Sequence, residues 1–155
     1  MTQFARPDAD ITTQWTTTPL WSKVDEASVD DADFIQDSTS GDVAELNLSD
    51  VTDPVSASTH VVRWRRRSGT SPNVTIALYQ GATLIASNTD TTTSGSFADA
   101  SFTLSGAEAD AITDYTDLRL RFTNNANVNY RVSQCWFECP DVPAGGHSRV
   151  KMMQY

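Results

Sequence analysis

Alternation of apolar and polar residues recurs along the chain from residue 43 onward. A period of two is typical of β-strands that are buried on one face and exposed on the other. In HVVRWRRR, residues 60–67, Val62 and Trp64 share the inner face, and the arginines at 63, 65 and 67 share the outer one. Strands are also predicted at residues 43–49, 74–80, 83–89, 101–104, 118–122 and 129–139, with two more around 12–17 and 31–37. The pattern predicts an all-β protein.

One short helix is predicted at residues 105–112, where Ser105 and Glu108 have the spacing of a capping box. Many short strands, polar connections and this single helical crossover predict an antiparallel β-sandwich, and a jelly roll is favoured over an immunoglobulin topology. We expect an extended N-terminal arm at residues 1–12, a jelly-roll domain at residues 13–139 and an extended C-terminal arm at residues 140–155.

The charge of the chain restricts its partners. The 155 residues carry a formal net charge of -9, from 20 acidic and 11 basic residues. A sequence pI near 4.4 argues against a nucleic-acid partner, because DNA-binding domains usually have a pI above about 9. No run approaches the roughly 18 apolar residues of a membrane span, and the first residues lack the apolar region of a signal peptide. We therefore expect no membrane partner and synthesis in a cytoplasm.

Arginines are concentrated on two of the predicted strands. Arg63, Arg65 and Arg67 share one face of the first, and Arg119 and Arg121 repeat the pattern in LRLRF. If both strands lie in one sheet, the two rows form a single basic face. Two interpretations stay open: pairing with Asp-rich loops of the same molecule, or binding of an acidic protein surface, which suits the planar guanidinium group. Phosphate contacts would act against the field of the acidic protein.

The two cysteines are predicted to be free thiols. On an extended strand Cys135 and Cys139 lie about 13 Å apart, beyond the roughly 7 Å limit for a disulfide. Zinc would need two further ligands, which His60 and His147 do not supply at a suitable spacing. The acidic stretch 24–37 lacks the EF-hand pattern, so a solvated or arginine-pairing loop is favoured over calcium binding. No metal or cofactor is predicted.

The aromatic residues and the known catalytic motifs add little. Trp64 is predicted to be buried, whereas Trp15 and Trp21 are the better candidates for exposed aromatics. A sugar-stacking platform would need such residues clustered at period two on one strand, and this cluster is not found. The chain has no nucleophile elbow, glycine-rich phosphate loop or His-Glu-x-x-His motif, so it is predicted not to be an enzyme.

Four segments within residues 8–138 resemble a group of small jelly-roll proteins of tailed bacteriophages. They are DITTQWTTTPLWSKVDEASVDDADFI, LNLSDVTDPVSASTHVVRWRRR, VTIALYQGATLIAS and FTLSGAEADAITDYTDLRLRFT. The resemblance implies a virion structural protein, in the first place a head decoration or cement protein. Such a protein would bind the major capsid protein as a homotrimer and stabilise the exterior of the capsid.

The residues that this resemblance places at protein interfaces lie on the arginine faces and at the chain ends. They are Phe4, Arg6, Arg63, Arg65, Arg67, Arg119, Arg121, Met152 and Tyr155. Two alternatives share the same fold: a carbohydrate-binding or host-attachment module associated with a tail fibre, and another tail or neck subunit. An antiparallel sandwich serves many functions and does not choose between them.

Overall fold

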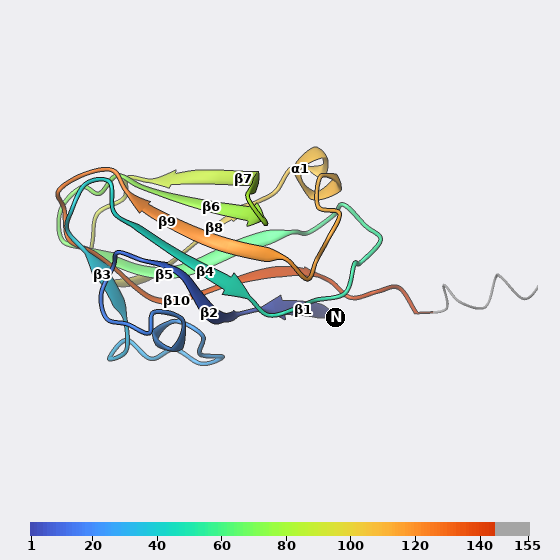
Figure 1. Cartoon of the computed structure of the whole chain (residues 1–155), viewed down its shortest axis with the longest axis horizontal. Helices are drawn as coiled ribbons and strands as arrows, with labels where there is room; N and C mark the ends of the chain where they lie inside the picture. Colours follow the sequence, from blue (N-terminus) through green and yellow to red (C-terminus); the bar gives the residue numbers. More distant parts are fainter. Residues whose placement is uncertain (145–155) are drawn as a thin grey trace, which may run out of the picture.

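A computed structural model describes residues 1–144, which form a jelly-roll sandwich of two five-stranded antiparallel sheets (Figure 1). Sheet A has the order β1-β10-β5-β8, with β3 also paired to β10, and sheet B has the order β2-β4-β9-β6-β7. Sheet A contains β1 (Thr2–Ala5), β3 (Ile35–Asp37), β5 (Val61–Ser68), β8 (Ser94–Thr103) and β10 (Tyr130–Pro140). Sheet B contains β2 (Pro7–Thr13), β4 (Val43–Leu48), β6 (Val74–Gln80), β7 (Thr83–Asp90) and β9 (Leu118–Asn124).

Two short helices lie in the connections between these strands. The 3-10 helix η1 (Trp21–Lys23) follows β2, and α1 (Gly106–Asp110) links β8 of sheet A to β9 of sheet B. The predicted capping box is confirmed, because Ser105 Oγ accepts from the Glu108 backbone N–H and Glu108 Oε2 accepts from the Ser105 N–H. In the described part of the chain, neither helix is long and apolar enough to cross a membrane.

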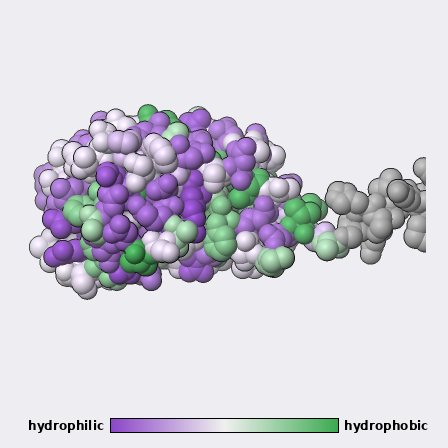
Figure 2. Space-filling model, turned by 90° about the horizontal axis from the view of Figure 1, so that it is seen from below, coloured by the Kyte–Doolittle hydropathy of each residue, from purple (hydrophilic) through white to green (hydrophobic). Residues whose placement is uncertain are grey.

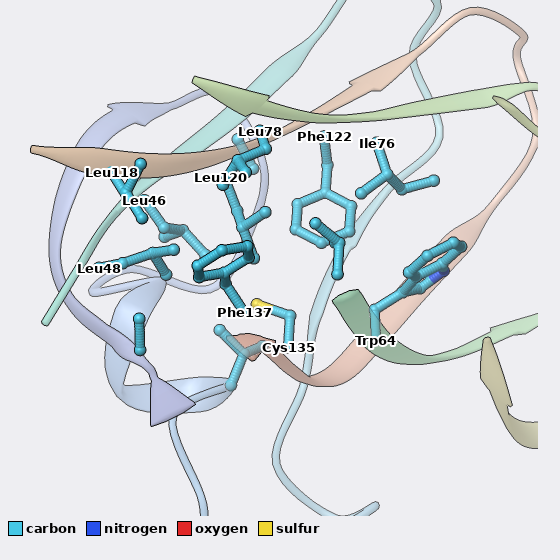
Figure 3. Packing of buried hydrophobic residues seen from close by; sticks show 14 of the residues in the cluster. Leu46, Leu48, Trp64, Ile76, Leu78, Leu118, Leu120, Phe122, Cys135 and Phe137 are labelled. Carbon is cyan, nitrogen blue, oxygen red and sulfur yellow. The ribbon is translucent and has the colours of Figure 1, made fainter. Parts of the chain in front are cut away.

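The core lies between the two layers and follows the predicted alternation. Figure 3 shows side chains from both sheets pointing into this space, including Leu46, Leu78 and Leu120 of sheet B and Phe137 of sheet A. Val62 and Trp64 are buried on the inner face of β5, as predicted. Apolar side chains on alternate positions are thus removed from water on one face of each sheet, which is the dominant favourable term in folding.

The N-terminal part of the chain differs from the prediction. An arm was expected at residues 1–12, but β1 pairs with the end of β10 and β2 pairs with β4, so both strands belong to the sandwich. Only Ala5 and Pro7 are buried on these strands, and the sequence therefore shows little hydrophobic periodicity there. The expected C-terminal arm lies largely outside the described residues, which end at residue 144, as do Met152 and Tyr155.

Further details of the strands and of the aromatic residues also differ from the prediction. The strand expected around residues 12–17 lies earlier, at Pro7–Thr13, and the strand expected at 101–104 begins already at Ser94. Residues 89–96 do not form a hairpin between β7 and β8, because these two strands lie in different sheets. Trp15, expected to be exposed, is buried against Phe122 and Tyr130.

Both cysteines are free thiols, as predicted, and both are buried. Burial raises the pKa of both thiols, that of Cys139 to about 11. The thiolate is the reactive form of cysteine, so the folded protein should be inert toward thiol reagents. We expect no modification at about pH 8 in the native state, and two modified thiols per chain after unfolding. Rapid native labelling of either cysteine, measured by mass spectrometry, would contradict the placement of β10.

An arginine lies on the inner face of β5. The Arg66 and Asp90 side chains are only 7% and 5% exposed, and Arg66 Nε donates to Asp90 Oδ2 at 2.8 Å. The same carboxylate oxygen accepts from the Tyr130 hydroxyl at 2.7 Å, and the Trp64 indole N–H donates to that hydroxyl at 2.9 Å. Because β7 belongs to sheet B and β5 and β10 belong to sheet A, this network joins the two sheets.

Removal of one partner from this buried pair should strongly destabilise the protein. We expect Arg66→Met to lower the free energy of unfolding by about 3–5 kcal/mol, because it leaves the Asp90 carboxylate buried without its cation. Arg67→Met, at the exposed neighbouring position, should change it by less than about 0.5 kcal/mol. Denaturant unfolding of the two variants measures both values, and equal small losses would show that the pair does not hold the sheets together.

Candidate binding face

The outer face of sheet A carries the arginines that stand out in the sequence. The strand register places outward side chains of β10, β5 and β8 in rows across the sheet. The rows are Trp136–Arg63–Ser101, Gln134–Arg65–Asp99 and Arg131–Arg67. We call these outward side chains of sheet A the arginine face. Figure 2, which views the molecule from below relative to Figure 1, shows a largely hydrophilic surface with scattered apolar patches.

Arg65 occupies the middle of the arginine face and is held by two carboxylates. Its Nε and Nη2 donate to the two oxygens of Asp31 at 2.8 Å each, and its Nη1 donates to Asp99 at 3.0 Å. The Arg65 hydrogen bond, aided by that of Ser133, lowers the pKa of Asp31. Through Asp31 the acidic stretch pairs with an arginine, which is one of the two alternatives that the sequence left open.

A shallow pocket of about 280 Å³ lies at one end of the arginine face. It is lined by Arg63, Trp64, Asp99, Ala100, Ser101 and Trp136, and we call it the Trp136 pocket. Glu138 Oε1 accepts from the Trp136 indole N–H at 2.9 Å and from Arg63 Nε at 2.7 Å. On the β1 side, the Arg6 guanidinium stacks on the Trp136 ring at 5.4 Å and on the Phe4 ring at 5.5 Å. These contacts fix the half-buried indole in place.

A second pocket, of about 300 Å³, lies at the other end of the same face. It is lined by Arg67, Ser68, Gly69, Thr70, Asn129 and Arg131. Arg131 Nε donates to Gln36 at 3.1 Å, and its guanidinium lies over the Phe34 ring at 5.0 Å. Arg67 is exposed. We call this site the Arg67–Arg131 pocket.

The two arginine rows do not form a single basic face. Arg119 and Arg121 lie on β9, in sheet B, and therefore on the opposite side of the sandwich from the arginine face. The buried Glu45 carboxylate accepts from Arg121 Nη2 at 2.9 Å and lies 3.7 Å from Arg119 Nη1. Arg121 also stacks on Tyr79, with the guanidinium carbon 4.1 Å from the ring centre. This row is thus engaged within the molecule.

Sequence reasoning found part of this arrangement. Arg63, Arg65 and Arg67 lie on the predicted face, and Arg6 contacts both Phe4 and Trp136. Trp136 and Arg131 were not among the predicted interface residues, although Trp136 alternates with the inward Cys135 and Phe137 and could have been assigned to the outside. Trp21 is half-buried and packs against the core instead of contributing to an exposed platform.

Metal-binding side chains do not gather in the described residues. Across residues 1–144 no group of three or more histidine, cysteine, aspartate or glutamate side chains is arranged to hold an ion. His60 is buried, with its Nε2 2.8 Å from the Tyr115 hydroxyl and its Nδ1 3.0 Å from the Ser58 carbonyl. Burial lowers the pKa of His60. The arginine face thus consists of aromatic, guanidinium, carboxylate and hydroxyl groups.

Comparison with known proteins identifies the fold. No protein-family model and no curated protein sequence matches the chain. The crystal structure of the CBM36-1 domain of a multidomain xylanase, from the hindgut metagenome of Trinervitermes trinervoides, aligns with a TM-score of 0.50. It is 7% identical, and the alignment covers 93% of this chain and 100% of that domain.

Two further solved structures align less well. The family 29 carbohydrate-binding module CBM29_1 of Piromyces equi has a TM-score of 0.47 at 9% identity, over 94% of this chain and 95% of that one. A cyclase from Fischerella sp. TAU has a TM-score of 0.48 at 13% identity, over 90% and 91% of the two chains. At these identities the likeness to the CBM36-1 domain supports the jelly-roll fold and nothing finer.

The Asp31–Arg65 contact should control the mobility of residues 24–34. We expect Arg65→Gln to raise hydrogen exchange in this segment by roughly tenfold, because a bidentate charge-assisted contact is lost. Acid should also raise hydrogen exchange in this segment of the wild-type protein. Because the pKa of Asp31 is lowered in the folded protein, the ionised Asp31 stabilises the segment above about pH 3.9, and this stabilisation is lost as the pH falls through the lowered pKa. Arg67→Gln is the control, and equal exchange in both variants would refute the role of Arg65.

Proposed function

We propose that this chain is a non-catalytic carbohydrate-binding module that places a sugar ring in the Trp136 pocket. The observation that carries the proposal is the fixed, half-buried indole of Trp136, bordered by the hydrogen-bonding groups of Arg63, Asp99 and Ser101. The shared fold with the CBM36-1 domain of a xylanase is compatible with this function but does not by itself establish it.

The chemistry of the Trp136 pocket suits a sugar. A pyranose ring has an apolar face of C–H groups and an edge of hydroxyl groups. An aromatic ring can cover the apolar face, and guanidinium, carboxylate and hydroxyl groups can donate to and accept from the edge. Within residues 1–144, only the Nε atom of Arg63 has a hydrogen-bond partner, so its two terminal nitrogens remain for a ligand. Ser101 and Asp99 are exposed beside them.

The pocket is also organised before any ligand binds. The indole of Trp136 is held at its nitrogen by Glu138 and on its ring by Arg6. All of the lining residues lie on the strands β5, β8 and β10. A site on regular strands loses little conformational entropy on binding. A small pocket can therefore bind a ligand with few contacts.

A second candidate function is protein binding at the edge of sheet A, as in a phage decoration protein. The observation that favours it is Phe4, which is 48% exposed on the edge strand β1, where exposed aromatic residues commonly mark a protein interface. In solution, light scattering at low and high salt would test it. A salt-resistant trimer that becomes monomeric in Phe4→Ser would support this function over the carbohydrate-binding one.

Binding to a glycan array of neutral and acidic sugars tests the leading proposal. We expect Trp136→Ala to weaken the binding of the best glycan by at least roughly tenfold, because the stacking surface is lost. Tyr79→Ala removes an aromatic side chain from the outer face of sheet B and should leave the affinity unchanged. Both variants should retain the wild-type circular dichroism. Equal affinities for the two variants would exclude the Trp136 pocket as the sugar site.

A further inference from the structure

Arg67 and Arg131 are directly opposite each other on β5 and β10. In an antiparallel pair such side chains share a face with Cβ atoms about 4.5–5.5 Å apart, and like charges at this distance repel. Within residues 1–144 neither guanidinium has a carboxylate partner. Five of the six other arginines of this region do have one, namely Arg63, Arg65, Arg66, Arg119 and Arg121, and Arg6 donates to the Glu26 carbonyl instead. Two adjacent positive charges therefore lack a counter-charge on this face.

The Arg67–Arg131 pocket has the composition of an anion site. No acidic residue lines it, and Thr70 and Asn129 add a hydroxyl and an amide to the two guanidinium groups. The Ser68 hydroxyl donates its one proton to the Thr70 carbonyl at 2.7 Å or to the Asn129 carbonyl at 3.2 Å, which links the two loops. Because Gln36 and Phe34 hold Arg131 by its Nε and its face, its terminal nitrogens remain for a ligand.

We infer that the Arg67–Arg131 pocket binds the anionic group, carboxylate or sulfate, of an acidic polysaccharide. The inference rests on the proposed function, because the same polysaccharide would occupy the Trp136 pocket. Arg63 and Arg67 are four residues apart on β5, which separates the two pockets by about 13 Å, the span of a short oligosaccharide. Arg65 lies between them but is held by Asp31 and Asp99, so the anion is directed to the end of the row.

The net charge of -9 does not prevent this binding. Charges more than about 10 Å apart are largely screened at 0.1 M salt, whereas guanidinium groups at hydrogen-bond distance from an anion are screened much less. Guanidinium groups also match carboxylate and sulfate oxygens in a bidentate geometry, which favours arginine over lysine in such a site. The pocket can therefore bind an anionic substituent although the protein as a whole is negatively charged.

The test compares charged and uncharged forms of the same carbohydrate by calorimetry. One pair is oligogalacturonate and its methyl ester, and the other is sulfated and unsulfated dextran. We expect one charged form to bind at least roughly tenfold more tightly than its uncharged partner. The pair that shows the difference identifies carboxylate or sulfate as the group. The advantage should disappear in Arg67→Gln and be kept in Lys23→Gln, which removes the same charge elsewhere.

Gly69 provides a second test within the pocket. A Cβ atom at Gly69 would meet nothing within 4 Å and the backbone is not left-handed there, so side chains are tolerated. Gly69→Asp places a carboxylate beside the two arginines and should abolish the preference for the charged form, whereas Gly69→Ser should retain it. Retention of the preference in Gly69→Asp would overturn the inference.

The outcomes separate this inference from the proposed function. Equal binding of charged and uncharged forms, with both weakened by Trp136→Ala, overturns the anion pocket and supports the proposed function. Binding of a charged form that is lost in Arg67→Gln but unchanged in Trp136→Ala supports the anion pocket and removes the Trp136 pocket from carbohydrate binding. Binding of none of the four carbohydrates overturns the anion inference, and the wider glycan array then decides on the proposed function.

Discussion

The ion pair between Arg66 and Asp90 fixes how the two sheets meet. A buried guanidinium needs a carboxylate and further hydrogen bonds, so the end of β7 has to lie over the inner face of β5. Strict alternation then places Arg63, Arg65 and Arg67 on the outside of the same strand. A slip of one residue would turn these three side chains into the core. One register therefore determines both the core and the arginine face.

The distribution of carboxylates gives the two outer faces different properties. On sheet B, the buried Glu45 pairs with both Arg119 and Arg121, so each arginine of this row has a carboxylate partner. On sheet A, carboxylates accompany Arg63 and Arg65 but do not reach Arg67 in the described residues. The positive charge on the arginine face therefore increases along β5 toward its end. An acidic protein can in this way present a local cationic site.

Short sequence patterns predict those structural features that depend on residues close together in the sequence. The alternation of apolar and polar residues predicted the strands β4, β5, β6 and β9, and the capping box at Ser105 predicted α1. Both signals are contained in a few neighbouring residues. β1 and β2 bury too few side chains for such a signal. The pocket between Arg67 and Arg131 depends on the pairing of strands 64 residues apart and on the irregular register between Val132 and Gln134. No short motif contains that information.

The acidic loop and the arginine face depend on each other. Along one side of β10, β3 pairs with residues 130–132 and β1 with residues 137–140, and the loop at residues 24–26 fills the gap between them. There the Cys135 N–H donates to the Val24 carbonyl, and the Gln134 side chain donates to the carbonyl of Glu26. Arg6, which stacks on Trp136, donates to the same Glu26 carbonyl. Arg65 holds the other end of this loop through Asp31. Arg65 therefore also stabilises the loop that positions Arg6 beside Trp136.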